Sequence, residues 1–152
     1  MRNGLLIALA VILLDQASKL WAEAALSYAA PVPVFPSLNL TLMHNPGAAF
    51  SFLGDAGGWQ RWFFLALALG VSAWLIVWMR GLKAHERWTG FALALIIGGA
   101  LGNAIDRIWH GFVIDFIDLY WTSYHWPAFN IADSAITVGT GLLVVRMLFE
   151  KK

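Results

Sequence analysis

The sequence predicts an all-α membrane protein: a four-transmembrane-helix bundle with a small extracytoplasmic β-rich segment and a second loop on the same, periplasmic side. Three observations lead to this fold class. Of the 152 residues, 60% are hydrophobic and only 12% are charged, whereas a soluble domain carries about 25% charged residues. Four apolar runs approach or reach the roughly 20 residues that a transmembrane helix needs. The connections between them are short, which favours one compact helical bundle.

We predict a single integral membrane domain over residues 1–152, with spans at 4–22, 62–79, 88–105 and 131–149. The first run also has the features of a cleaved signal peptide, but three further spans favour an uncleaved helix. Asp15 and Lys19 lie inside this run at an i,i+4 spacing, with the acid N-terminal to the base. That order favours an ion pair on one helix face, which either fixes helix packing or supports a site.

The segment between the first two spans is not helical. Pro31, Pro33 and Pro36 interrupt any helix, and apolar residues alternate from position 32 to 42, which predicts short strands. A turn is expected at Asn45-Pro46-Gly47, in a loop that lies on the membrane interface. The segment 111–126 is rich in aromatic residues, and we expect it to be the second interfacial loop.

The third span ends in a polar cluster. Gly98 and Gly102 have the GxxxG spacing that permits close helix contact. Asn103, Asp106 and Arg107 follow on one helix face, because they are three or four residues apart. We expect Asp106 to form a local ion pair with its neighbour Arg107.

The basic residues indicate an orientation. Seven of the ten fall on one side of a four-span arrangement: Arg2, Arg80, Lys83, Arg87, Arg146, Lys151 and Lys152. The positive-inside rule places that side, with both termini, in the cytoplasm. The carboxylates of the candidate site then face outward. No basic patch with interleaved aromatic residues supports nucleic-acid binding, and the absence of cysteine removes thiol chemistry.

Carboxylates are the groups that remain for chemistry. Asp115 and Asp133 flank the aromatic segment, each in an apolar context. Two carboxyls brought together at low dielectric cannot both ionise, and such a pair can activate water as aspartic proteases do. Asn130 is placed to cap the fourth helix, with Asp133 at its third position. We expect Asp118 to be a surface acid. From spacing alone, structural polar clusters and a proton or ion relay remain open alternatives.

The chain resembles the bacterial lipoprotein signal peptidases (signal peptidase II) in five ordered blocks: DQASK at 15–19, NPGAAFS at 45–51, GGALGNAIDR at 98–107, VIDFI at 113–117 and FNIADS at 129–134. The resemblance implies a membrane aspartic endopeptidase of the inner membrane, which cuts the signal peptide from a prolipoprotein just before its diacylglyceryl-modified Cys. It implies Asp115 and Asp133 as the catalytic pair. Substrate-binding or supporting roles are implied for Asp15, Lys19, Asn45, Gly47, Asn103, Arg107 and Asn130.

The resemblance also implies partners: diacylglyceryl-modified prolipoproteins and membrane lipids, and no nucleic acid. No metal or cofactor is required, since two carboxylates and a water suffice for the hydrolysis. The alternative from another class is a small membrane transporter or proton relay that uses intramembrane carboxylates. A third is an assembly protein in which the polar clusters are only structural.

Overall fold

The computed structural model describes residues 2–47 and 57–149. In this part of the chain the helices are α1 (Arg2–Ala25), α2 (Trp59–Gly81), α3 (Arg87–Trp109) and α4 (Ile131–Phe149). All four are long and apolar enough to cross a membrane, as the sequence predicts. The first three extend beyond the expected bounds. In particular, α3 continues through Asp106 and Arg107, because both side chains find partners there instead of facing lipid.

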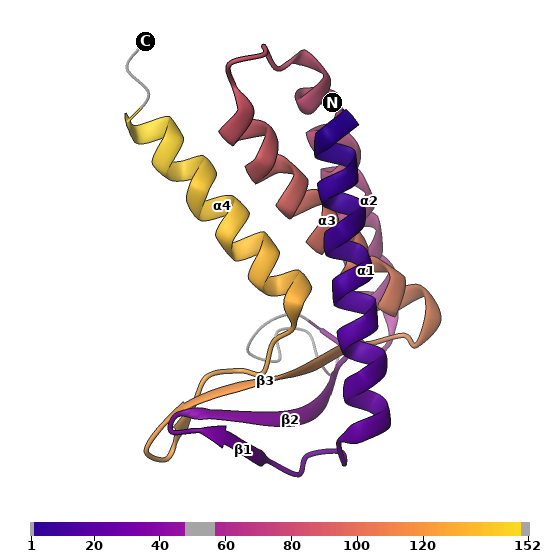
Figure 1. The fold of residues 1–152 in the computed structure, drawn as a ribbon. Helices are drawn as coiled ribbons and strands as arrows, with labels where there is room; N and C mark the ends of the chain where they lie inside the picture. Colours follow the sequence, from indigo (N-terminus) through magenta and orange to yellow (C-terminus); the bar gives the residue numbers. More distant parts are fainter. Residues whose placement is uncertain (1, 48–56, 150–152) are drawn as a thin grey trace.

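Helix α3 is the central helix of the bundle, since α1, α2 and α4 all pack against it (Figure 1). Its residues Ala92, Leu93 and Ala94 are completely buried. Leu75 and Met79 of α2 join the same apolar core. The outer helices instead expose many large apolar side chains, as expected for surfaces that contact lipid and not water.

Glycines bring the helix backbones close together. A Cβ on Gly98 would lie 2.8 Å from the carbonyl oxygen of Ala8, and one on Gly102 would lie 2.7 Å from a carboxylate oxygen of Asp15. The GxxxG pair therefore forms the α1–α3 contact. On the opposite side, a Cβ on Gly99 would collide with the carbonyl oxygen of Ala132 in α4. Tight α3 contacts on both sides thus depend on residues that lack a side chain.

Replacing Gly99 with alanine should destabilise the protein by about 1–3 kcal/mol, the usual cost of overpacking. The added methyl group would push α4 away from α3, because the atom that it meets is the backbone carbonyl oxygen of Ala132, which cannot rotate aside. Gly70→Ala in α2 is the matched control, since no atom lies within 4 Å of its Cβ position. Thermal unfolding followed by tryptophan fluorescence should show a lowered midpoint for Gly99→Ala alone.

Beyond the helices lies an antiparallel sheet in the order β1-β2-β3-β4. Strands β1 (Val32–Phe35) and β2 (Leu38–Asn45) confirm the strands expected from the alternating apolar residues. The expectation of a second loop at 111–126 is wrong, because β3 (Val113–Trp121) and β4 (Tyr124–His125) occupy it. Residues 113–116 are all buried, so β3 begins as a continuous buried run without the alternation that reveals a half-exposed strand.

The sheet lies at the end of the bundle away from both termini (Figure 1). Strand β3 follows α3 directly, and the chain returns from β4 to α4 alongside β3. Phe129 pairs with Ile117 in this return, through N–H···O bonds of 2.8 and 3.0 Å. The pairing brings the residues that begin α4 beside the middle of β3, and it thereby assembles the polar site.

Candidate functional site

Asp115 projects from β3 into a buried amide environment. Its side chain is 2% exposed and accepts one hydrogen bond at each oxygen. Asn45 donates from Nδ2 to Oδ2 (3.1 Å), and Asn130 donates from Nδ2 to Oδ1 (2.8 Å). Burial, followed by the nearby charge of Asp133, raises the pKa of Asp115 to about 7. This carboxyl therefore holds a proton far more readily than an ordinary aspartate.

Asp133 lies in the first turn of α4. Its Oδ1 accepts a hydrogen bond from Asn103 Nδ2 at 2.7 Å, and its Oδ2 accepts one from the backbone N–H of Asn130 at 3.3 Å. The N–H of Asp133 in turn donates to Asn130 Oδ1 at 2.8 Å. This reciprocal pair is a capping box, and it confirms the expected role of Asn130 as the cap of α4.

Asn130 connects the two carboxyls. It is completely buried, and its side-chain oxygen is committed to the helix cap. The amide nitrogen must therefore point the other way, where it donates to Asp115 and to Asn103 Oδ1 (3.1 Å). A local helix-capping motif thus sets the orientation of the group that contacts the β3 carboxyl.

Arg107 supplies a buried positive charge beside this pair. It interacts electrostatically with Asp133 and Asp115, and its Nη2 donates to the carbonyl oxygen of Gly47 at 2.9 Å. The N–H of Gly47 donates to Asn45 Oδ1 at 3.0 Å, which confirms the expected turn and turns the Asn45 amide toward Asp115. Residues 48–51 of the same sequence block lie outside the described residues.

Lys19 forms the predicted ion pair with Asp15, at 2.8 Å. The expected local pair between Asp106 and Arg107 is wrong, because Asp106 instead pairs with Lys19 at 2.8 Å. The lysine also donates to Asn103 Oδ1 at 2.9 Å. Asn103 and Arg107 are four residues apart on α3, and both side chains face the site. The Asp106 side chain faces α1 instead, and the spacing of these residues along the helix does not predict this difference.

Asp118 is not the surface acid that the sequence suggests. It is 5% exposed and contacts three side chains: Asn39 Nδ2 at 3.3 Å, Thr41 Oγ1 at 3.0 Å and His125 Nδ1 at 2.8 Å. Burial alone would raise the pKa of this carboxyl, but hydrogen bonds led by that of His125 outweigh burial and lower the pKa. Asp118 therefore holds the sheet together and lies apart from the other carboxyls.

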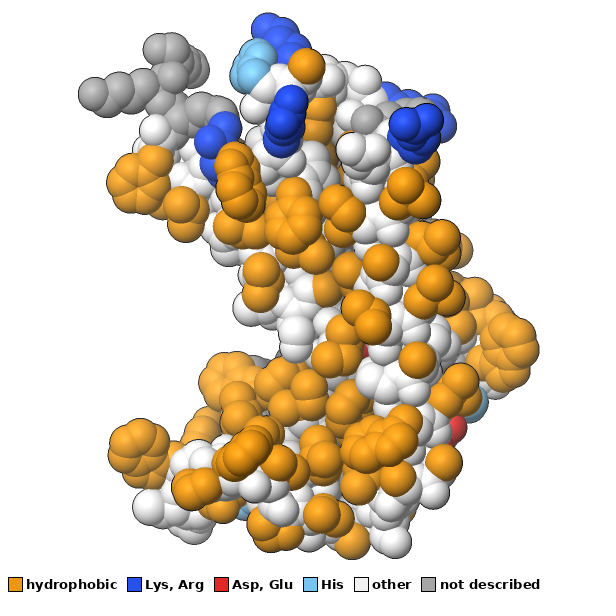
Figure 2. All heavy atoms as spheres, viewed as in Figure 1, with side chains coloured by type: hydrophobic (Ala, Val, Ile, Leu, Met, Phe, Trp, Pro, Cys, Tyr) orange, Lys and Arg blue, Asp and Glu red, His pale blue; other side chains and the backbone are white. Residues whose placement is uncertain are grey.

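A cleft of about 620 Å³ opens onto the site. The hollow is visible in Figure 2 between α4 and the sheet. Asp133, Asn103 and Arg107 contribute polar groups to its wall, and the rest is largely apolar, including Val113, Leu119, Trp126, Phe129, Ile136 and Val138. An extended apolar chain with one polar reacting bond fits such a cleft.

The structure brings together all of the residues implied by the resemblance: the pair Asp115 and Asp133, and the supporting residues around them. Sequence reasoning missed Gln16, whose Nε2 donates to Asp106 Oδ1 at 2.8 Å, and the contact of His125 with Asp118. Gln16 could have been singled out because it follows Asp15 directly in the sequence block at 15–19. Among the described residues, no group of three or more His, Cys, Asp or Glu side chains is placed to hold a metal ion.

Comparisons with known proteins identify the family of this chain. The sequence model described as Signal peptidase (SPase) II matches residues 7–149. The chain is 56% identical to a lipoprotein signal peptidase of Acinetobacter baumannii over 93% of this chain and 80% of that protein. It is 49% identical to one of Vibrio cholerae over 96% of this chain and 81% of that protein.

The fold agrees as well. A solved structure described as a bacterial membrane enzyme superposes with a TM-score of 0.88 at 32% identity, over 100% of this chain and 93% of the other. A second one, described in the same words, gives a TM-score of 0.85 over 99% and 96% of the two chains. Sequence and fold thus lead to one conclusion: the chain belongs to the signal peptidase II family.

Proposed function

We propose that this protein is a membrane aspartic endopeptidase that removes the signal peptide from lipid-modified prolipoproteins by cutting before the diacylglyceryl-Cys. The observation that carries the proposal is the pair Asp115 and Asp133, joined through Asn130, with Asp133 in the wall of an apolar cleft. Membership of the signal peptidase II family favours this peptidase over a transporter or proton relay.

The pair supplies both halves of general acid–base catalysis. One carboxylate takes a proton from a water molecule, which attacks the scissile carbonyl carbon, while the other carboxyl donates its proton to the carbonyl oxygen. A proton then passes to the leaving nitrogen as the C–N bond breaks. Side-chain amides donate to three of the four carboxylate oxygens, and the backbone N–H of Asn130 donates to the fourth, so these donors hold the pair in position for this exchange.

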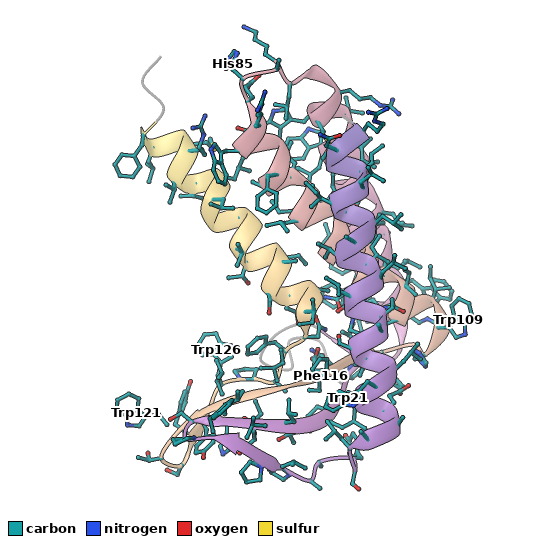
Figure 3. The ribbon with its side chains drawn as sticks, in the orientation of Figure 1. Trp21, His85, Trp109, Phe116, Trp121 and Trp126 are labelled. Atoms are coloured by element: carbon teal, nitrogen blue, oxygen red, sulfur yellow. The ribbon has the colours of Figure 1, made fainter. Side chains whose placement is uncertain are left out.

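The proposed orientation puts this chemistry at the outer face of the inner membrane. Figure 2 shows Lys and Arg side chains gathered at the end that carries both termini, the end that the positive-inside rule assigns to the cytoplasm. The sheet and the site lie at the other end. Trp121 and Trp126 project from the sheet (Figure 3), and aromatic side chains of this kind favour the interface between lipid and water.

The depth of the site suits the proposed substrate. The α4 wall of the cleft, which includes Ile136 and Val138, belongs to a helix that is long and apolar enough to cross the membrane. A signal helix and a diacylglyceryl chain both reside in lipid, so they reach the cleft without entering water. We propose that the whole chain acts as one integral membrane domain.

Cleavage of a defined precursor tests the proposal. Purified protein in lipid nanodiscs is mixed with a precursor whose Cys carries a diacylglyceryl group, and mass spectrometry identifies the products. We expect one cut immediately before the modified Cys, and no cut in the same precursor with Cys→Ser. Intact lipid-modified precursor after prolonged incubation, with correctly folded protein, would contradict the proposed function.

The raised pKa of Asp115 predicts how cleavage depends on pH. The pair works with one proton between the two carboxyls, and Asp115 has a pKa of about 7. As pH rises through this value the pair loses its proton, so the cleavage rate should fall above about pH 7. Initial cleavage rates at saturating precursor, measured from pH 4 to 9, test this expected fall in rate. A rate that stays constant up to pH 9 would show that no shared proton is required.

A further inference from the structure

Two buried carboxylates outside the proposed catalytic pair each accept a hydrogen bond from the backbone. Asp15 Oδ1 accepts the N–H of Ala132 at 2.9 Å, and Asp106 Oδ2 accepts the N–H of Ile114 at 3.1 Å. Ala132 immediately precedes Asp133, and Ile114 immediately precedes Asp115. The backbone just before each proposed catalytic aspartate is therefore held by a separate carboxylate. Asp15 holds the segment that carries Asp133, and Asp106 holds the segment that carries Asp115.

A single ammonium group joins these two carboxylates. Lys19 Nζ lies 2.8 Å from Asp15 Oδ2 and 2.8 Å from Asp106 Oδ2, and the three side chains are at most 2% exposed. We call Asp15, Lys19 and Asp106 the carboxylate bridge. It spans α1 and α3, and through the two backbone N–H groups it reaches α4 and β3.

The third contact of Lys19 acts on the same pair. Its Nζ donates to Asn103 Oδ1, and an ammonium group can only donate. The Asn103 oxygen must therefore face Lys19, which turns its amide nitrogen toward Asp133 Oδ1. The carboxylate bridge thus sets one hydrogen-bond donor of the pair as well as its two backbone segments.

Stability alone is a poor explanation for this arrangement. Burying three charges costs desolvation energy that their attraction often fails to recover, so apolar replacements can be as stable. Gly102 leaves the space that Asp15 occupies, and Gln16 Nε2 donates to Asp106 Oδ1. The surroundings are therefore shaped to hold both carboxylates in fixed positions.

We propose that the carboxylate bridge sets the separation of Asp115 and Asp133, so that Asp15, Lys19 and Asp106 are positioning residues of the peptidase. This inference rests on the proposed function. Because the bridge holds both backbone segments through one nitrogen atom, a change at either end moves one carboxyl relative to the other. The distance between the two carboxyls controls how strongly they share a proton.

The width of the pH–rate profile reports that separation. Two close carboxyls titrate in two well-separated steps, and the singly protonated pair is the active form between them. When the carboxyls move apart, the coupling weakens and the two apparent pKa values approach each other. The profile of kcat then becomes narrower, whereas a loss of folded protein lowers the profile without changing its width. Charges that face the pair from other elements are Asp15 and Lys19 in α1 and Arg107 in α3. Lys19 and Arg107 remain in every variant tested. The Ala and Asn variants of Asp15 both remove the Asp15 charge, so a difference in width between them reports the lost acceptor and not the lost charge.

The experiment compares matched substitutions at the two ends of the bridge. Asp15→Ala and Asp106→Ala remove the acceptor of the backbone N–H, and each should narrow the profile and lower kcat by about 100-fold, as a misplaced catalytic group does. Asp15→Asn and Asp106→Asn retain an oxygen acceptor for the same N–H and should keep most of the wild-type width. Ile97→Ala, in the apolar core, is the control for reduced stability and should leave the width unchanged.

Wild-type protein measured alongside separates the two hypotheses. Absence of cleavage by the wild type contradicts the proposed function, whereas active Ala variants with wild-type width overturn the bridge proposal. If the Ala variants do not fold, Asp15→Glu and Asp106→Glu replace them, because each keeps the charge but moves the acceptor by one methylene group. A narrower profile in the Glu variants supports the bridge, and an unchanged one overturns it.

Discussion

Asp115→Asn and Asp133→Asn should each abolish cleavage of a lipid-modified precursor, with a loss of about 10,000-fold in kcat, at the upper end for a lost general acid or base. Asparagine has almost the same shape as aspartate, but its amide cannot exchange a proton with water or with the substrate. Because the two carboxyls act as one unit, the double variant should be no worse than either single variant.

Asp118→Asn is the matched control for these variants. It lies three residues from Asp115 on the same strand, and it too is buried among hydrogen-bond donors. Its contacts hold the sheet and do not reach the pair, so its kcat should stay near the wild-type value. Tryptophan fluorescence and size-exclusion chromatography would establish that all variants fold. Cleavage by either single Asn variant within tenfold of wild type would rule out the proposed catalytic pair.

Asn130→Asp should give the second-largest effect, a loss of about 100-fold or more in kcat. Aspartate caps a helix as well as asparagine does, so α4 keeps its start. The amide that donates to Asp115 Oδ1 at 2.8 Å is replaced by a third carboxylate beside the pair. That charge raises the pKa of Asp115 further, so the activity that remains should persist to higher pH than in the wild type.

Asn39→Asp is the control for Asn130→Asp, because Asn39 donates to a different carboxylate, Asp118 Oδ2, at 3.3 Å. It should weaken the sheet without changing kcat of the folded protein. Asn130→Ala removes the cap and the donor together and should lower both the unfolding temperature and kcat. Equal loss of activity in Asn130→Asp and Asn39→Asp would mean that acidic substitution in the sheet region disturbs the fold generally.

Local patterns predicted a large part of this molecule. Apolar runs marked the four helices because a span must be long and continuous. The capping box at Asn130 and Asp133 and the ion pair of Asp15 and Lys19 were both predictable, because their partners are three or four residues apart. The same reasoning failed for β3, where burial of consecutive residues removes the alternation that identifies a strand.

The partners of the carboxyls could not be predicted in this way. Asp106 was assigned to its sequence neighbour, yet it pairs with Lys19 on another helix. Asp118 is expected at the surface because the segment 111–126 is predicted to be a loop on the solvent side, yet Thr41 of β2 lies against it. In both cases the competing partner is far away in the chain, and only the packing of α1 on α3 or of β2 on β3 makes it available.

By itself, the sequence determined the number of spans, the presence of two carboxyls in apolar surroundings and the cap that begins α4. These features depend on local periodicity and on the cost of placing polar groups in lipid. Only the tertiary structure decided which groups hold Asp115 and Asp133 in place. The hydrogen bonds responsible join residues 70 positions apart at Asn45 and Asp115 and 117 positions apart at Asp15 and Ala132. Such contacts arise when helix packing and strand pairing are both complete, so no local segment encodes them.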